Sequence, residues 1–138
     1  MDTIAIPLIL IMALSIILYT IGTFLGIKDK KLSKKHIIFF HISVVLMIIG
    51  IFYMSGISSQ LSYGDATYKM MAIHQGLGYL AVLVMIVHAI IITIVKRKYN
   101  KKNFSTNKGF NILSFILWLI CIILYLITFY IGILATIK

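Results

Sequence analysis

Acidic side chains are almost absent from this chain of 138 residues. Asp2, Asp29 and Asp65 are the only ones, against 13 Lys and Arg side chains, and the net charge is +10. All three lie outside the centres of the long apolar runs. Transporters of protons or cations commonly place carboxylates at mid-membrane depth. Their absence argues against such a transporter and leaves histidine as the candidate titratable group inside the apolar runs.

Cysteine is equally scarce. Cys121 is the only one, so the chain has no internal disulfide and no CxxC redox or metal motif. We expect Cys121 to act as a small packing residue in the last apolar run.

Apolar residues are what the chain has in excess. They make up 62% of the sequence, and the mean hydropathy is +1.09, which is more than a soluble domain of this size can bury. Four runs, near residues 4–27, 37–57, 70–95 and 109–137, are each long enough to cross a bilayer. Because they are continuous rather than alternating, they predict helices. We therefore expect one all-α transmembrane domain over residues 1–138, an integral membrane four-helix bundle.

The positive charge is confined to two connections. Eleven of the 13 Lys and Arg side chains lie in residues 28–35 and 96–108, whereas the middle connection, residues 58–69, carries little charge. This is the positive-inside pattern. It predicts a cell-membrane protein with both basic loops in the cytoplasm and both termini outside. The expected partners of the lysines are anionic lipid headgroups, and no nucleic-acid partner is expected.

Two histidines share one face of the third run. His74 and His88 are fourteen residues apart, which on a helix is about 21 Å along the axis and within about 40° around it. Ionisable side chains in membrane helices usually face the bundle interior. Gly78 and Ala81 lie on the arc between them, and such small residues leave room either for a flat group or for a close helix contact.

The second run offers a partner for one of these histidines. It is expected to run antiparallel to the third, with the midpoint of the connection near residue 64, so His41 should lie level with His88. Two histidines that face each other at one depth are the ligands of a bis-histidyl haem. Hydrogen-bonded core histidines, or a bare metal or proton-relay site, are the alternatives for the same residues.

Two weaker candidates complete the set. In the same antiparallel arrangement Met54 is expected opposite His74. Met is a known axial ligand of haem, although packing is the more common role of a membrane methionine. His74 could instead serve a quinone pocket, or a second haem completed by a partner subunit. His36 follows two lysines at the expected membrane interface, where no ligand role is required.

The stretch that begins His74-Gln-Gly-Leu-Gly and continues to His88 resembles the haem helix of membrane b-type cytochromes. Over residues 35–98 the chain is similar to the ferric reductase transmembrane domain and to the cytochrome b561 group. The resemblance implies haem b, with His74 and His88 on one helix and His41 as one partner. In those families two helices often carry two histidines each, and here the fourth histidine ligand is missing. The resemblance is therefore compatible with one haem or with two.

The resemblance also implies a function. The protein would pass electrons within or across the membrane, alone, in an oligomer or as the haem subunit of an oxidoreductase. Electrons would come from a redox partner protein or a quinone, because no flavin or nicotinamide domain is recognisable. The alternative is a non-catalytic bundle, an assembly subunit or a small transporter with structural histidines. The test between them is whether His41 and His88 face each other.

Overall fold

The computed structural model of the chain contains four long helices. They are α1 (Asp2–Asp29), α2 (Lys34–Ser59), α3 (Asp65–Tyr99) and α4 (Lys108–Ile137). The structure describes residues 2–30, 32–59, 65–99 and 108–137; residues 100–107, most of the second predicted basic loop, lie outside this range. The prediction of four apolar helices is confirmed. The first three helices extend two to five residues beyond their predicted apolar runs at each end, whereas α4 begins only one residue before its run and ends with it.

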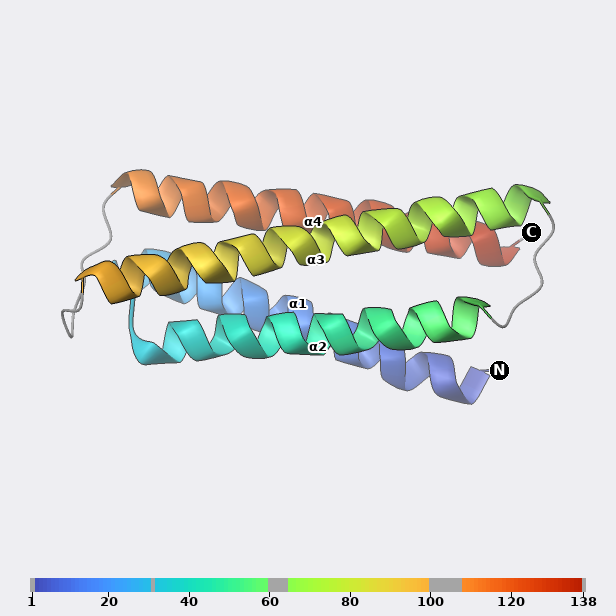
Figure 1. The fold of residues 1–138 in the computed structure, drawn as a ribbon, viewed down its shortest axis with the longest axis horizontal. Helices are drawn as coiled ribbons and strands as arrows, with labels where there is room; N and C mark the ends of the chain where they lie inside the picture. The colour runs from blue at the N-terminus through green and yellow to red at the C-terminus, as the bar shows by residue number, and fades with distance from the viewer. Residues whose placement is uncertain (1, 31, 60–64, 100–107, 138) are drawn as a thin grey trace.

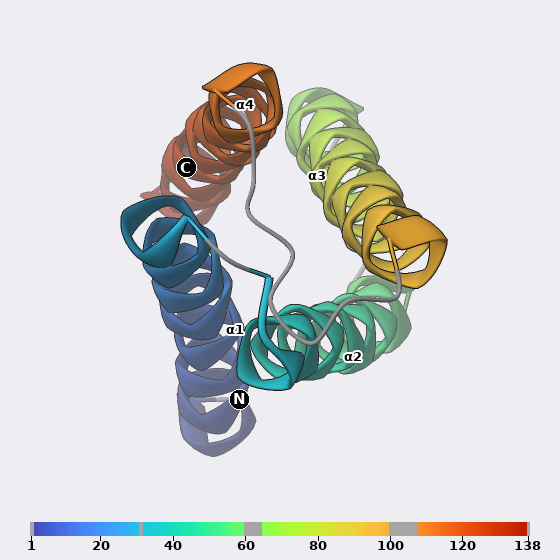
Figure 2. The same ribbon diagram turned by 90° about the vertical axis from the view of Figure 1, so that its left-hand side faces the viewer.

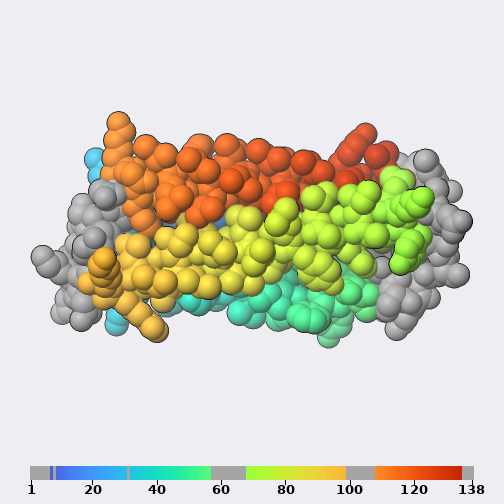
Figure 3. Space-filling model, turned by 45° about the horizontal axis from the view of Figure 1, so that its top comes forward, coloured from blue at the N-terminus to red at the C-terminus, as the bar shows by residue number. Residues whose placement is uncertain are grey.

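The helices run up and down in chain order around a ring (Figures 1 and 2). Both chain termini lie at the end where α2 leads to α3, which we call the terminal end. We call the opposite end, where α1 leads to α2 and α3 leads to α4, the lysine end. Packing is closest within the pairs α1–α2 and α3–α4, weaker between α2 and α3, and weakest between α1 and α4. The close contact of α3 with α4 is visible along one face of the molecule (Figure 3).

The turn between α1 and α2 is fixed by its own side chains. Lys30 has a φ of 49°, the left-handed conformation that commonly ends a helix. Ser33 precedes α2, and its N–H donates to Nδ1 of His36 at 3.3 Å. This is the geometry of a capping box, in which the third helical residue bonds back to the cap. Nε2 of His36 lies 3.4 Å from the carboxylate of Asp29, so His36 has a structural role at this turn.

The molecule is apolar outside and partly polar inside. Large apolar side chains cover the surface between the two ends; Phe52, for example, is 74% exposed. Hydroxyl groups are buried and link helices: Ser15 on α1 donates to the Ser43 carbonyl on α2 at 2.7 Å, and Nε1 of Trp118 on α4 donates to Thr20 on α1 at 3.1 Å. Such interhelical hydrogen bonds are typical of bundles in lipid. All four helices are long and apolar enough to cross a membrane.

The apolar core lies along the axis of the ring. Its largest members are at most 2% exposed: Tyr19, Phe40, Leu32, Met47, Met85 and Ile92. Cys121 is also fully buried there, in agreement with the packing role predicted for it.

Candidate functional site

His88 lies in the middle of the bundle with no exposed surface. Its Nδ1 is 2.7 Å from the Tyr19 hydroxyl on α1, and its Nε2 is 2.9 Å from the Ser114 hydroxyl on α4. A neutral imidazole has one donor and one acceptor nitrogen, and a hydroxyl can complement either. Both nitrogens are therefore occupied, and His88 links α3 to α1 and α4.

The residue of α2 that meets His88 is Phe40, not His41. The Phe40 ring centroid lies 4.9 Å from that of His88. The residue of α2 that lies level with His88 is therefore the neighbour of the predicted His41. One residue corresponds to about 100° of helix rotation, which turns His41 to the exposed outer face. There its Nδ1 donates to the Ile37 carbonyl of its own helix at 2.8 Å. The structure therefore does not bring His41 and His88 together. The test set for a haem between them has a negative outcome, and a haem could be held only at another site.

His74 lies near the terminal end of α3 and has one nitrogen engaged. Its Nδ1 is 2.8 Å from the Thr128 carbonyl on α4. A carbonyl only accepts, so the proton is on Nδ1 and the lone pair is on Nε2. Among the residues that the structure describes, Nε2 of His74 has no hydrogen-bond partner. An imidazole held in this way, with one N–H on a carbonyl, is typical of a metal ligand.

Gly132 explains how the imidazole of His74 comes so close to α4. A Cβ at position 132 would lie 3.0 Å from Cε1 and 3.1 Å from Nδ1 of His74, closer than ordinary packing allows. A glycine one turn after Thr128 therefore makes the space for the ring beside the carbonyl that orients it.

A cavity of about 300 Å³ opens at His74 between the four helices. Its walls are apolar and include Met12, Met54, Met71 and Phe129. A smaller cavity of about 30 Å³ adjoins it and shares His74, Met54 and Met12. The structure thus places Met54 and His74 in one cavity, at the level that the antiparallel register predicted.

The donor groups at the two histidine sites differ in how well they suit a haem. His41 and His88 do not fit one, because His41 points outward and both nitrogens of His88 are bonded within the bundle. The donor atoms of His74 and Met54 suit haem iron, because an imidazole nitrogen with no hydrogen-bond partner among the described residues and a thioether belong to residues that line the same apolar space. Within the described residues, no group of three or more His, Cys, Asp or Glu side chains is placed to hold a metal ion.

Several residues of these sites were not singled out from the sequence. Tyr19 and Ser114 bind His88, whereas Thr128 and Gly132 position His74. Each is a polar residue or a glycine inside an apolar run. Met54 was identified because it lies at the same depth as His74 on an antiparallel helix. The same comparison of depths for the first and fourth apolar runs would have identified some of these four residues.

No protein-family model, curated protein or solved structure matches this chain. The assignment of a function therefore depends on the chemistry of His74 and its cavity.

Proposed function

We propose that the protein is a multi-pass membrane protein that binds haem b in the cavity at His74 and serves electron transfer. The observation that carries this proposal is the state of His74: Thr128 holds Nδ1 at 2.8 Å, and Nε2 has no hydrogen-bond partner within the described part of the chain. His74 lines a cavity that is also lined by Met54. The His–Met pair is an established axial ligand set of haem iron.

In this proposal the chain supplies ligands, orientation and a dry pocket. His74 would donate the lone pair of Nε2 to the iron, with Thr128 keeping the imidazole in the tautomer that leaves Nε2 unprotonated. Met54 would supply the second ligand from α2. The side chains of Tyr125 and Phe129 line the cavity and limit access of water. Bound haem supplies one-electron redox chemistry, which the side chains of this chain do not provide.

The orientation in the membrane follows from the lysines. The positive-inside rule places the lysine end in the cytoplasm, so the cavity at the terminal end lies toward the outer surface. Electrons would then be exchanged there with a quinone or a redox partner protein. The protein would act alone or as the haem subunit of a membrane oxidoreductase.

The test is a reduced-minus-oxidised absorption spectrum of the detergent-purified protein after expression with added haem, with a pyridine haemochrome assay for stoichiometry. We expect α and Soret bands in the wild type and their loss in His74→Ala. Met54→Leu should keep the haem but change its spectrum, because one axial ligand is lost. His41→Ala is the matched control, since its imidazole lies on the outer face, and should match the wild type.

Two results would overturn this assignment. Loss of the bands in both His41→Ala and His88→Ala, but not in His74→Ala, would place the haem between the pair predicted from the sequence. A colourless wild-type protein would remove haem altogether and favour the non-catalytic bundle with structural histidines. Circular dichroism of every variant separates loss of haem from loss of fold.

The three methionines at His74 favour a second candidate, binding of Cu(I). Met12, Met54 and Met71 line the cavity together with His74, and thioether ligands select Cu(I) over harder metals. Metal analysis after anaerobic incubation with Cu(I) distinguishes the two functions. If the cavity binds Cu(I), Met12→Leu and Met71→Leu should lower the amount of copper retained. If it binds haem, the same two variants should leave the haem absorbance unchanged.

A further inference from the structure

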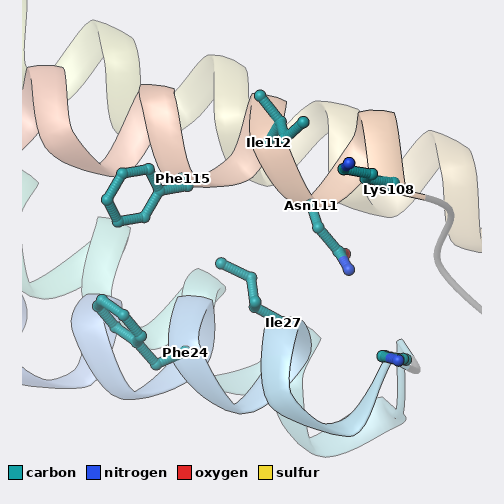
Figure 4. Close-up of a pocket in the computed structure, with 7 residues that line it drawn as sticks. Phe24, Ile27, Lys108, Asn111, Ile112 and Phe115 are labelled. Carbon is teal, nitrogen blue, oxygen red and sulfur yellow. The ribbon is translucent and has the colours of Figure 1, made fainter.

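A groove of about 540 Å³ lies at the lysine end, between α1 and α4. This is the seam at which neighbouring helices pack least closely. Figure 4 shows its walls: Phe24 and Ile27 rise from α1, and Asn111 and Phe115 descend from α4 to face them. The groove is separate from the His74 cavity, which lies at the other end of the bundle.

The mouth of the groove is positively charged. Lys30 follows the end of α1 and Lys108 begins α4, and both line the groove. The first turn of α4 adds backbone N–H groups that have no partner within the helix. The nearest described carboxylate in sequence, Asp29, lies 3.4 Å from Nε2 of His36 and so is engaged toward α2. An anion at the mouth therefore meets two ammonium groups from different helices.

One turn further in, the groove contains a polar group without a partner. Oδ1 of Asn111 is buried and forms no hydrogen bond with any residue the structure describes. In Figure 4 the amide of Asn111 points from α4 across the groove toward α1. A buried amide without a polar partner costs free energy, so a ligand that brings polar groups to this level would be favoured.

Beyond Asn111 the groove becomes aromatic and apolar. Phe24 and Phe115 pack edge to face with their centroids 6.4 Å apart, and Phe24 also packs on Trp118 at 4.9 Å. Phe24 is 43% and Phe115 41% exposed, so both rings present surface to whatever lies in the seam. From the end of the bundle inward, the groove thus offers cations, then a polar amide, then apolar rings.

We propose that this groove binds one anionic phospholipid, of the phosphatidylglycerol type. The phosphate lies between Lys30 and Lys108, the glycerol ester groups lie level with Asn111, whose amide N–H group donates to an ester carbonyl, and an acyl chain lies against Phe24 and Phe115. Phosphate, ester groups and acyl chain follow one another in such a lipid in the order in which the groove offers cations, a polar amide and apolar rings. The site goes beyond the haem proposal and does not depend on it.

The test compares lipid binding by native mass spectrometry of the purified wild-type protein, titrated with phosphatidylglycerol or with phosphatidylcholine. The groove variant carries Lys30→Gln and Lys108→Gln. The control variant carries Lys34→Gln and Lys35→Gln, which remove the same charge from the same end but on α2. Each basic side chain near an anionic headgroup is worth roughly a fivefold change in binding, so we expect the groove variant to bind phosphatidylglycerol about 25-fold more weakly.

The outcomes distinguish a specific lipid-binding site from non-specific electrostatic attraction of anionic lipids. The control variant should keep the wild-type preference for phosphatidylglycerol, and Asn111→Leu should weaken phosphatidylglycerol binding without any change of charge. Equal losses in both lysine variants would show diffuse electrostatics and overturn the proposal. Competition by inorganic phosphate as effective as that by phosphatidylglycerol would show a site for a free anion, which also overturns it.

Discussion

Removal of one oxygen atom from the interior provides a direct test of the packing around His88. In Tyr19→Phe the ring is retained, including its edge-to-face contact with Phe40 at 5.5 Å. The only loss is the hydroxyl that lies 2.7 Å from Nδ1 of His88. Tyr19 and His88 are both 0% exposed, so no water replaces the missing partner.

The expected cost follows from this burial. Interhelical hydrogen bonds in membrane proteins contribute about 0.6 kcal/mol on average and at most about 1.7 kcal/mol. A bond of 2.7 Å between two fully buried groups belongs at the upper end of that range, since its loss leaves a buried nitrogen unpaired. We therefore expect a loss of about 1–2 kcal/mol, which is about a 5- to 30-fold increase in the unfolded fraction.

The assay is unfolding in mixed micelles with increasing sodium dodecyl sulfate, followed by fluorescence of Trp118. Tyr79→Phe is the matched control, because the Tyr79 hydroxyl donates to Ser55 at 3.3 Å at an exposed site, and it should change stability by less than about 0.5 kcal/mol. If Tyr19→Phe is no more destabilising than Tyr79→Phe, the hydrogen-bonded position of His88 described above is refuted.

Three further predictions concern single positions. Gly132→Ala should displace the His74 ring, because the new Cβ would lie 3.0 Å from Cε1, and haem absorbance should fall while helix content is unchanged; retained absorbance would count against the site. Gly76→Ala should raise stability by about 0.5–1 kcal/mol in the same micelle assay, since no heavy atom lies within 4 Å of the added Cβ and alanine favours helix; Gly50→Ala should bring no such gain, because its Cβ would lie 2.7 Å from Cγ of Met12. Lys96→Met should lower stability by about 1 kcal/mol, because Nζ donates to the Leu32 carbonyl at 2.6 Å, whereas the exposed Lys98→Met should have little effect; equal effects would rule out this bond as the cause.

The sequence predicted the helices and their levels well, because both follow from simple lengths. A run of apolar residues sets where a helix lies, and an antiparallel connection sets which residues share a depth. This placed Met54 with His74 in one cavity, and it placed α2 correctly against His88 to within one residue.

The face that each residue presents was harder to predict. An error of one residue shifts the depth by only about 1.5 Å but turns the side chain by about 100°, enough to exchange Phe40 for His41. The apolar runs carry little information on rotation, because apolar residues cover nearly the whole circumference of each helix. The rotation of each helix about its axis is set instead by its few interior polar residues, such as Ser43 on α2. These residues could not be used for prediction, because their hydrogen-bond partners lie on neighbouring helices whose positions the sequence does not give.

The unequal packing of the four helices implies that the chain is made of two separable halves. α1 packs closely on α2, α3 packs closely on α4, and the contacts between the two pairs are fewer. Each pair is also joined at the lysine end, so each can enter a bilayer as a hairpin soon after it is synthesised. The contacts that then join the hairpins are specific polar ones, notably Tyr19 with His88 and Thr20 with Trp118. Two polypeptides produced by a break in residues 60–64 should therefore find each other in the membrane and co-purify, and Tyr19→Phe should weaken that reassembly more than it weakens the intact chain.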